Sequence, residues 1–169
     1  MQIPSYDNVK VSIGQDSHAF EESNGKPLIL GGVVFEGYPG MRANSDGDVV
    51  LHAITNAVSG VTCRNILGKP ADEMCKSGIT DSAEYLKVAL EDLKEKNMTI
   101  SHLSITMECL RPKISPKVDE MRKSIGSLLG ISPDCVGITA TTGEGLTAFG
   151  KGEELWFFVS SPSAKERKR

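Results

Sequence analysis

Three side chains in the first third of the chain have the chemistry of a metal site. Asp16 and His18 are separated by one residue in the segment IGQDSHAF, and His52 follows in SDGDVVLHA. On a strand, side chains two positions apart face the same way, so Asp16 and His18 can point at one ion. One carboxylate and two imidazoles, with a fourth position open, form the donor set of a catalytic zinc site. The spacing alone leaves an alternative, a hydrogen-bonded His52 on the inner face of a helix.

A strand and a helix must bring these side chains together. Apolar and polar residues alternate at the start of residues 9–20, which predicts a strand. Ser45 or Asp46 can then serve as an N-cap, and apolar residues recur with helical spacing until Gly60. This pattern predicts a helix that carries His52 about one turn from its start.

Strands and helices alternate along the rest of the chain. Strands are predicted at residues 28–35, with a break at the two central glycines, and in the segments TISHLSITMECL, CVGITATT and ELWFFVS. Helices are predicted at about residues 81–96 and 116–130. Residues 64–80 show no periodicity and are predicted to form a loop of functional length.

This order of elements predicts one α/β (α+β) domain, with a mostly β-sheet core covered by helices on one side. We expect the domain to span residues 1–160. Residues 161–169 are rich in Lys and Arg, and we expect them to form a disordered basic tail.

Size and charge narrow the classes of function. The 169-residue chain has a formal net charge of -3, so it lacks the basic field that attracts nucleic acid, and no nucleic acid partner is expected. No apolar run approaches the roughly 18 to 20 residues that a membrane span needs, so no membrane partner is expected either. The four cysteines show no CxxC spacing and the N-terminus shows no signal-peptide pattern, which predicts a cytoplasmic protein with buried thiols.

A second group of chemically suggestive residues surrounds Glu144, in the segment TATTGEGLTAFGKGEE. The backbone amides of such small residues can approach an anion closely. A carboxylate in that setting fits a second, hard cation such as Mg²⁺ or Mn²⁺, held between Glu144 and phosphate oxygens. The alternative is an ordinary glycine-rich turn without a ligand.

The motifs D-x-H-x-F, SDGDVVLHA, GITDS, RPKISP and ATTGEGLTAFGKGE follow one another within residues 9–159. In this succession they resemble the 2-C-methyl-D-erythritol 2,4-cyclodiphosphate synthase family. The resemblance implies a homotrimer with active sites between subunits and zinc held by Asp16, His18 and His52. It also implies Mg²⁺ or Mn²⁺ held at Glu144. The implied substrate is the cytidine diphosphate ester of methylerythritol 2-phosphate, whose 2-phosphate attacks the β-phosphorus so that CMP leaves and a cyclic diphosphate forms.

The same resemblance assigns roles to further positions. Thr142 falls at the position credited with stabilising the transition state. Asn44 falls where the family has a histidine credited with stabilising charge on the phosphates. Substrate binding is assigned to Ser45, Gly68, Pro112, Lys113, Ala140, Thr141 and Lys151.

Several residues depart from the family pattern. Asn44 can donate a hydrogen bond but carries no positive charge. Asn56 replaces an aspartate, so an acceptor for an imidazole is expected to be neutralised there. Ile66 and Gly145 alter segments that usually read GDIG and TTTEK, and Lys151 replaces an arginine, which keeps the charge but loses the bidentate fork.

Three hypotheses about function follow. The first is an active cyclodiphosphate synthase of a divergent branch. The second is a non-catalytic zinc-binding trimer that binds an isoprenoid or nucleotide diphosphate, and the third is a related phosphoryl cyclase or lyase that acts on another diphosphate. The retained metal ligands favour catalysis, because a structural zinc site usually closes with four protein ligands.

Overall fold

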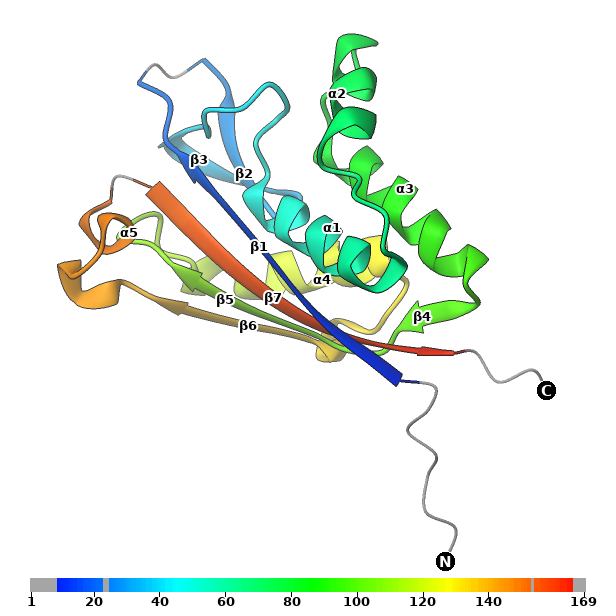
Figure 1. Cartoon of the computed structure of the whole chain (residues 1–169). Coiled ribbons are helices and arrows are strands. Elements are labelled where there is room, and N and C mark those ends of the chain that lie inside the picture. The colour runs from blue at the N-terminus through cyan, green and yellow to red at the C-terminus, as the bar shows by residue number, and fades with distance from the viewer. Residues whose placement is uncertain (1–8, 23–24, 153, 166–169) are drawn as a thin grey trace, which may run out of the picture.

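A mixed sheet, built from strands far apart in the sequence, forms one layer of the molecule (Figure 1). The computed structural model describes residues 9–22, 25–152 and 154–165. The strands of the sheet are β1 (Val9–Ala19), β4 (Met98–Ile100), β5 (Leu103–Glu108), β6 (Val136–Thr141) and β7 (Glu154–Lys165). They pair in the order β1-β7-β5-β6, and β4 also pairs with β7. β5 and β6 run parallel, whereas β7 is antiparallel to β1, β4 and β5.

Three helices cover one face of this sheet: α1 (Val49–Thr62), α3 (Ser82–Glu95) and α4 (Val118–Leu129) (Figure 1). A separate hairpin of β2 (Pro27–Leu30) and β3 (Val33–Pro39) packs against them. The helices, the hairpin and the inner face of the sheet share one apolar core, which includes Leu28, Ile54, Leu86, Ile105 and Met121. The prediction of one α/β domain with helices on one side of a sheet is therefore confirmed.

The shorter elements include a helix in the segment predicted to be a loop. They are α2 (Lys69–Lys76), α5 (Ala148–Lys151) and the 3-10 turns η2 (Ser115–Lys117), η3 (Pro133–Cys135) and η4 (Gly143–Gly145). The loop prediction is thus wrong at α2. None of its residues, all of which the structure describes, is fully buried, and only a short side that includes Ala71 and Met74 packs against the core. Eight residues with one such side are too few to show a helical repeat in the sequence. The local signals of the helix are Pro70 in the first turn and Lys76 in the last.

The boundary predicted for the basic tail is also wrong, because β7 continues to Lys165. Residues 161–164 pair with the start of β1 in antiparallel register, and residues 163–165 pair with β4 on the other side. Two neighbouring strands thus provide hydrogen-bond partners for the backbone of a segment whose composition is typical of a solvated tail. Residues 166–169 lie outside the described part of the chain.

Helix α1 begins two to three residues later than its sequence predicts. Asp48 is the N-cap, instead of Ser45 or Asp46, and its carboxylate accepts hydrogen bonds from the backbone N–H groups of Val50 and Leu51. The same carboxylate accepts hydrogen bonds from the N–H groups of Gly31 and Gly32, at 2.8 and 2.6 Å. Both glycines have positive φ angles, +62° and +76°. Asp48 therefore fixes the start of α1 to the turn of the β2-β3 hairpin.

Gly14 lets α1 cross directly over β1. A Cβ atom at position 14 would lie 2.1 Å from the carbonyl oxygen of Ala53 and 2.3 Å from the backbone nitrogen of Ala57. On either side of this crossing, the Ser12 hydroxyl donates to the carbonyl of Ala57 at 2.6 Å, and the Asn56 amide donates to the carbonyl of Gln15 at 3.0 Å. The crossing sets how far α1 stands from the strand that carries Asp16 and His18.

Candidate metal centre

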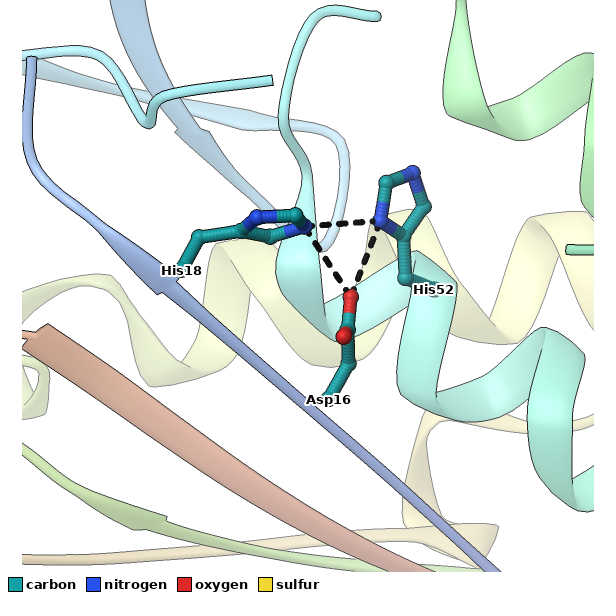
Figure 2. Close-up of side chains that lie close together, drawn as sticks. All are labelled: Asp16, His18 and His52. Atoms are coloured by element: carbon teal, nitrogen blue, oxygen red, sulfur yellow. Dashed lines mark hydrogen bonds and ion pairs between the residues drawn. The ribbon is translucent and has the colours of Figure 1, made fainter. Parts of the chain in front are cut away.

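The strand β1 and the helix α1 bring three side chains to one point, as Figure 2 shows. Asp16 Oδ2 lies 3.1 Å from His18 Nε2 and 3.0 Å from His52 Nδ1, and the two imidazole nitrogens are 3.2 Å apart. We call Asp16, His18 and His52 the metal cluster. Asp16 and His18 come from the same face of β1, as their spacing predicts, and His52 lies one turn into α1.

The metal cluster has the donor set and dimensions of a tetrahedral zinc site. Zinc binds imidazole nitrogen and carboxylate oxygen at about 2.0–2.2 Å, which places two ligand atoms about 3.3 Å apart in a tetrahedron. The separations of 3.0–3.2 Å between the three atoms are close to that value. Three protein ligands leave one corner for a substrate oxygen or water, which is the arrangement of a catalytic site.

The imidazoles also set the charge of the carboxylate. Burial by itself would raise the pKa of Asp16, but hydrogen bonds to His18 and His52 and the charges of these rings outweigh it and lower the pKa to about 2. Asp16 is therefore an anion throughout the neutral range. With one anionic carboxylate and two neutral imidazoles as ligands, a site that binds a divalent cation has a net charge of +1.

The ring of His52 is held from its far side as well. Its Nε2 atom lies 2.9 Å from the Ser82 hydroxyl and 3.4 Å from the Ser45 hydroxyl. Ser82 in turn hydrogen-bonds the carboxylate of Asp46. The sequence predicts neither contact; it predicts only that an acceptor for an imidazole is neutralised at position 56, where asparagine replaces the aspartate of the family. The Asn56 amide instead binds the backbone of Gln15.

A pocket of about 530 Å³ opens beside the metal cluster. Its walls include His18 and His52 together with Asn44, Ser45 and Gly68, three residues predicted to act on the substrate. The other lining residues are Glu21, Arg42, Ala43, Leu67, Ala71, Asp72, Cys75 and Tyr85. Three of these belong to α2, so the helix that the sequence did not predict forms one wall of the pocket.

The remaining predicted residues lie in a different part of the chain. Ala140 and Thr141 end β6, Thr142 and Glu144 belong to the turn at η4, and Lys151 ends α5. We call residues 140–151 the β6–α5 region. None of its residues is among those found to line the pocket or to form the metal cluster in the described ranges.

Hydrogen bonds give the β6–α5 region a defined shape although most of it is exposed. The Thr147 hydroxyl bonds the carboxylate of Glu108, and the N–H of Leu110 donates to the carbonyl of Phe149 at 3.3 Å. Pro112 and Lys113 come two and three residues after Leu110, so these two predicted residues lie near the β6–α5 region along the chain. One chain thus carries two separate groups of predicted site residues.

No helix in the described ranges of the chain is long and apolar enough to cross a membrane.

The fold and the site define a single-domain α+β protein with a three-residue candidate metal site and an adjoining pocket. The chain belongs to the YgbB family, whose model matches residues 9–160. It is 57% identical over 151 residues to 2-C-methyl-D-erythritol 2,4-cyclodiphosphate synthase of Chlamydia felis, covering 88% of this chain and 85% of the relative. The family predicted from the motifs is confirmed.

Solved structures show the same fold. The 2C-methyl-D-erythritol 2,4-cyclodiphosphate synthase of Plasmodium vivax superposes with a TM-score of 0.77 at 27% identity, covering 94% of this chain and 99% of that one. A further synthase of this name, solved in a form bound to CDP, gives a TM-score of 0.77 at 26% identity and covers 90% and 98% of the two chains. The topology described above is therefore shared with these enzymes.

Proposed function

We propose that this protein converts 4-CDP-2-C-methyl-D-erythritol 2-phosphate to 2-C-methyl-D-erythritol 2,4-cyclodiphosphate and releases CMP. The observation that carries the proposal is the convergence of Asp16, His18 and His52 at separations of 3.0–3.2 Å beside an open pocket. Relatives at 56% and 57% identity bear the name of this synthase. The classification as a phosphorus-oxygen lyase and the cytoplasmic location remain predictions.

The metal cluster fits zinc, and the proposal assigns zinc to Asp16, His18 and His52. Zinc bound there would offset the negative charge of the substrate phosphates and polarise the phosphorus that is attacked. This help is needed because the pocket also contains the carboxyl groups of Glu21 and Asp72, which repel a polyanion.

Within the proposal, Arg42 replaces the positive charge that Asn44 lacks. Among the pocket-lining residues in the described part of the chain, Arg42 is the only lysine or arginine. Its backbone N–H donates to the carbonyl of Ala19 at 2.8 Å, which anchors it one residue beyond His18. Its guanidinium pairs with the exposed carboxylate of Glu22 at 3.2 Å, and it can exchange that partner for a phosphate. Asn44 and Ser45 then supply neutral hydrogen bonds.

The β6–α5 region is proposed to bind the cytidine diphosphate part of the substrate. Thr141, Thr142 and Lys151 would contact the phosphates, and Glu144 would hold Mg²⁺ or Mn²⁺ between its carboxylate and phosphate oxygens. Pro112, Lys113 and Ala140 would enclose the cytosine and ribose. Glu144 has a φ of +50° and is exposed, so its carboxylate is free to meet a cation.

A homotrimer would bring the two groups of residues together, with the β6–α5 region of one chain facing the metal cluster of the next. The face of the sheet away from the helices supports this proposal. Val9, Val11 and Ile13 lie at alternate positions of β1, opposite in direction to Gly14 and Asp16, and are 46%, 69% and 61% exposed. Apolar side chains in a row on a sheet are typical of a surface that another subunit covers.

The test is an assay of purified protein with the cytidylyl substrate and Mg²⁺ or Mn²⁺. We expect release of CMP and formation of a cyclic diphosphate. Chromatography measures the CMP, and phosphorus NMR identifies the cyclic product. Binding of CDP without release of CMP from the substrate would contradict the proposal and support the non-catalytic zinc-binding trimer. Mass measurement in solution tests the trimer independently.

A further inference from the structure

His52 can serve as a metal ligand in only one tautomer. Its Nδ1 atom faces Asp16 Oδ2 at 3.0 Å and His18 Nε2 at 3.2 Å, so Nδ1 is the atom that would bind the cation. A neutral imidazole carries one proton, and the metal requires the lone pair of Nδ1. The proton must therefore sit on Nε2, where it needs an acceptor because His52 is only 7% exposed.

Ser82 is the acceptor for that proton. Its hydroxyl oxygen lies 2.9 Å from His52 Nε2, whereas the Ser45 hydroxyl is 3.4 Å away and also accepts from the N–H of Gly47. Ser82 is fully buried at the first position of α3. Water therefore cannot replace the hydroxyl without rearrangement of the helix.

Asp46 sets the direction of the hydrogen bonds. Its carboxylate accepts from the Ser82 hydroxyl, from the Ser82 N–H at 3.1 Å and from the Asp48 N–H at 3.1 Å. An ionised carboxylate can only accept, so the Ser82 proton points at Asp46 and a lone pair of Ser82 remains for His52. The hydrogen bonds run from His52 through Ser82 to Asp46.

We propose that Ser82 and Asp46 are positioning residues for the metal, which hold His52 in the Nε2-protonated tautomer and aim its Nδ1 atom at the cluster. The proposal rests on the zinc site of the proposed function. It assigns a role to the motifs SDGD and GITDS, since Asp46 lies in the first and Ser82 directly follows the aspartate of the second. It also explains how position 56 can be asparagine, because the ring of His52 already has its acceptor.

The test is the zinc affinity of Ser82→Ala, measured by competition with a chromophoric chelator. Loss of a partner that orients a ligating histidine typically weakens metal binding about 10–100-fold, and we expect a loss in that range. Thr55→Val is the matched control, because Thr55 is also fully buried and its hydroxyl bonds the carbonyl of Leu51 within α1. The control should lower the unfolding temperature but leave zinc affinity within about 3-fold of the parent protein.

Asp46→Asn tests the other end of the chain of hydrogen bonds. We expect it to weaken zinc binding, and the double variant Ser82→Ala/Asp46→Asn to be little weaker than Ser82→Ala alone, because both changes act through the same ring. Nitrogen NMR of ¹⁵N-labelled histidine in the zinc-loaded protein should show His52 protonated at Nε2. A Ser82→Thr variant, which retains the hydroxyl, should recover most of the affinity lost in Ser82→Ala.

Different outcomes overturn different statements. Ser82→Ala with the parent zinc affinity would overturn the positioning role and leave the proposed function intact. If Ser82→Ala does not fold, two other results would overturn the positioning role. One is a folded Asp46→Asn variant with the zinc affinity of the parent protein, and the other is an NMR spectrum that shows His52 protonated at Nδ1. A parent protein that binds no zinc would overturn the metal site and the positioning role together.

Discussion

The metal cluster and the β6–α5 region differ in how much of their geometry one chain provides. The cluster is held from several directions: β1 carries two ligands, Gly14 brings α1 close, and Ser82 supports His52 from behind. The β6–α5 region is largely exposed, and none of its residues lines the pocket in the part of the chain that the structure describes. A single chain thus provides the geometry of the candidate metal site, whereas the nucleotide site that we propose needs a second subunit.

This difference has a consequence for variants. Changes in the metal cluster should remove zinc and turnover together. Changes in the β6–α5 region should affect turnover while zinc stays bound. The experiments on His52, Glu144 and Arg42 therefore measure both zinc content and turnover.

The largest effect is expected for His52→Ala. Zinc should be lost, and turnover should fall at least about 100-fold, because even the partners that merely orient ligands cost 10–100-fold. Metal analysis and the CMP assay measure the two quantities. His102→Ala is the control, since His102 is exposed and lies outside the cluster. One zinc per chain in His52→Ala would refute the ligand assignment.

Glu144→Gln should separate the two regions. The variant should keep its zinc, and its turnover should fall about 100-fold at a fixed Mg²⁺ concentration, because a neutral amide cannot replace an anionic ligand to a hard cation. Glu91→Gln, an exposed change on α3, should be neutral. If Glu144→Gln turns over as fast as the parent protein, Glu144 does not bind a second cation. If Glu144→Gln loses its zinc, Glu144 belongs to the metal cluster.

Gly14→Ala tests the packing that builds the metal cluster. The added methyl group would lie 2.1 Å from the Ala53 carbonyl, so α1 must move away from β1. We expect the free energy of unfolding to fall by about 1–3 kcal/mol and zinc to bind more weakly. In Gly60→Ala the nearest atom is 3.4 Å away, and this control on α1 should be neutral or stabilising. Urea unfolding and chelator competition report both effects, and equal behaviour of the two variants would contradict the account.

A smaller effect is expected for Arg42→Gln, which removes the cation that lines the pocket. KM for the cytidylyl substrate should rise about 10-fold, equivalent to about 1.4 kcal/mol, with zinc content unchanged. Lys87→Gln is the control, because Lys87 pairs with exposed Glu84 on α3 away from the pocket. A KM equal to that of the parent protein, at both low and high salt, would show that Arg42 does not supply the positive charge that Asn44 lacks.

Much of the metal cluster could be predicted because it depends on local geometry. The spacing of Asp16 and His18 on one strand and the start of a helix before His52 are both short-range features. Their convergence followed only from the family resemblance, since nothing in the spacing brings α1 onto β1. That step depends on Gly14, whose role is visible only once the helix lies against it.

Other features were mispredicted because their causes lie far away in the sequence. Residues 161–165 have the composition of a tail, yet β1 and β4 supply strand partners for them. Helix α2 has only eight residues, and its partly buried side, which includes Ala71 and Met74, is too short to show a helical repeat in the sequence. It nevertheless forms a wall of the pocket.

By itself, the amino-acid sequence determined the α/β class, the family and the identity of the three candidate metal ligands, because these follow from short-range patterns of residue types and from the family's motifs. Only the tertiary structure decided that Ser82 and Asp46, rather than position 56, support His52, and that the β6–α5 region stands apart from the metal cluster. The physical reason is that hydrogen bonds and packing between distant segments depend on distances in space, which the order of residues along the chain does not specify.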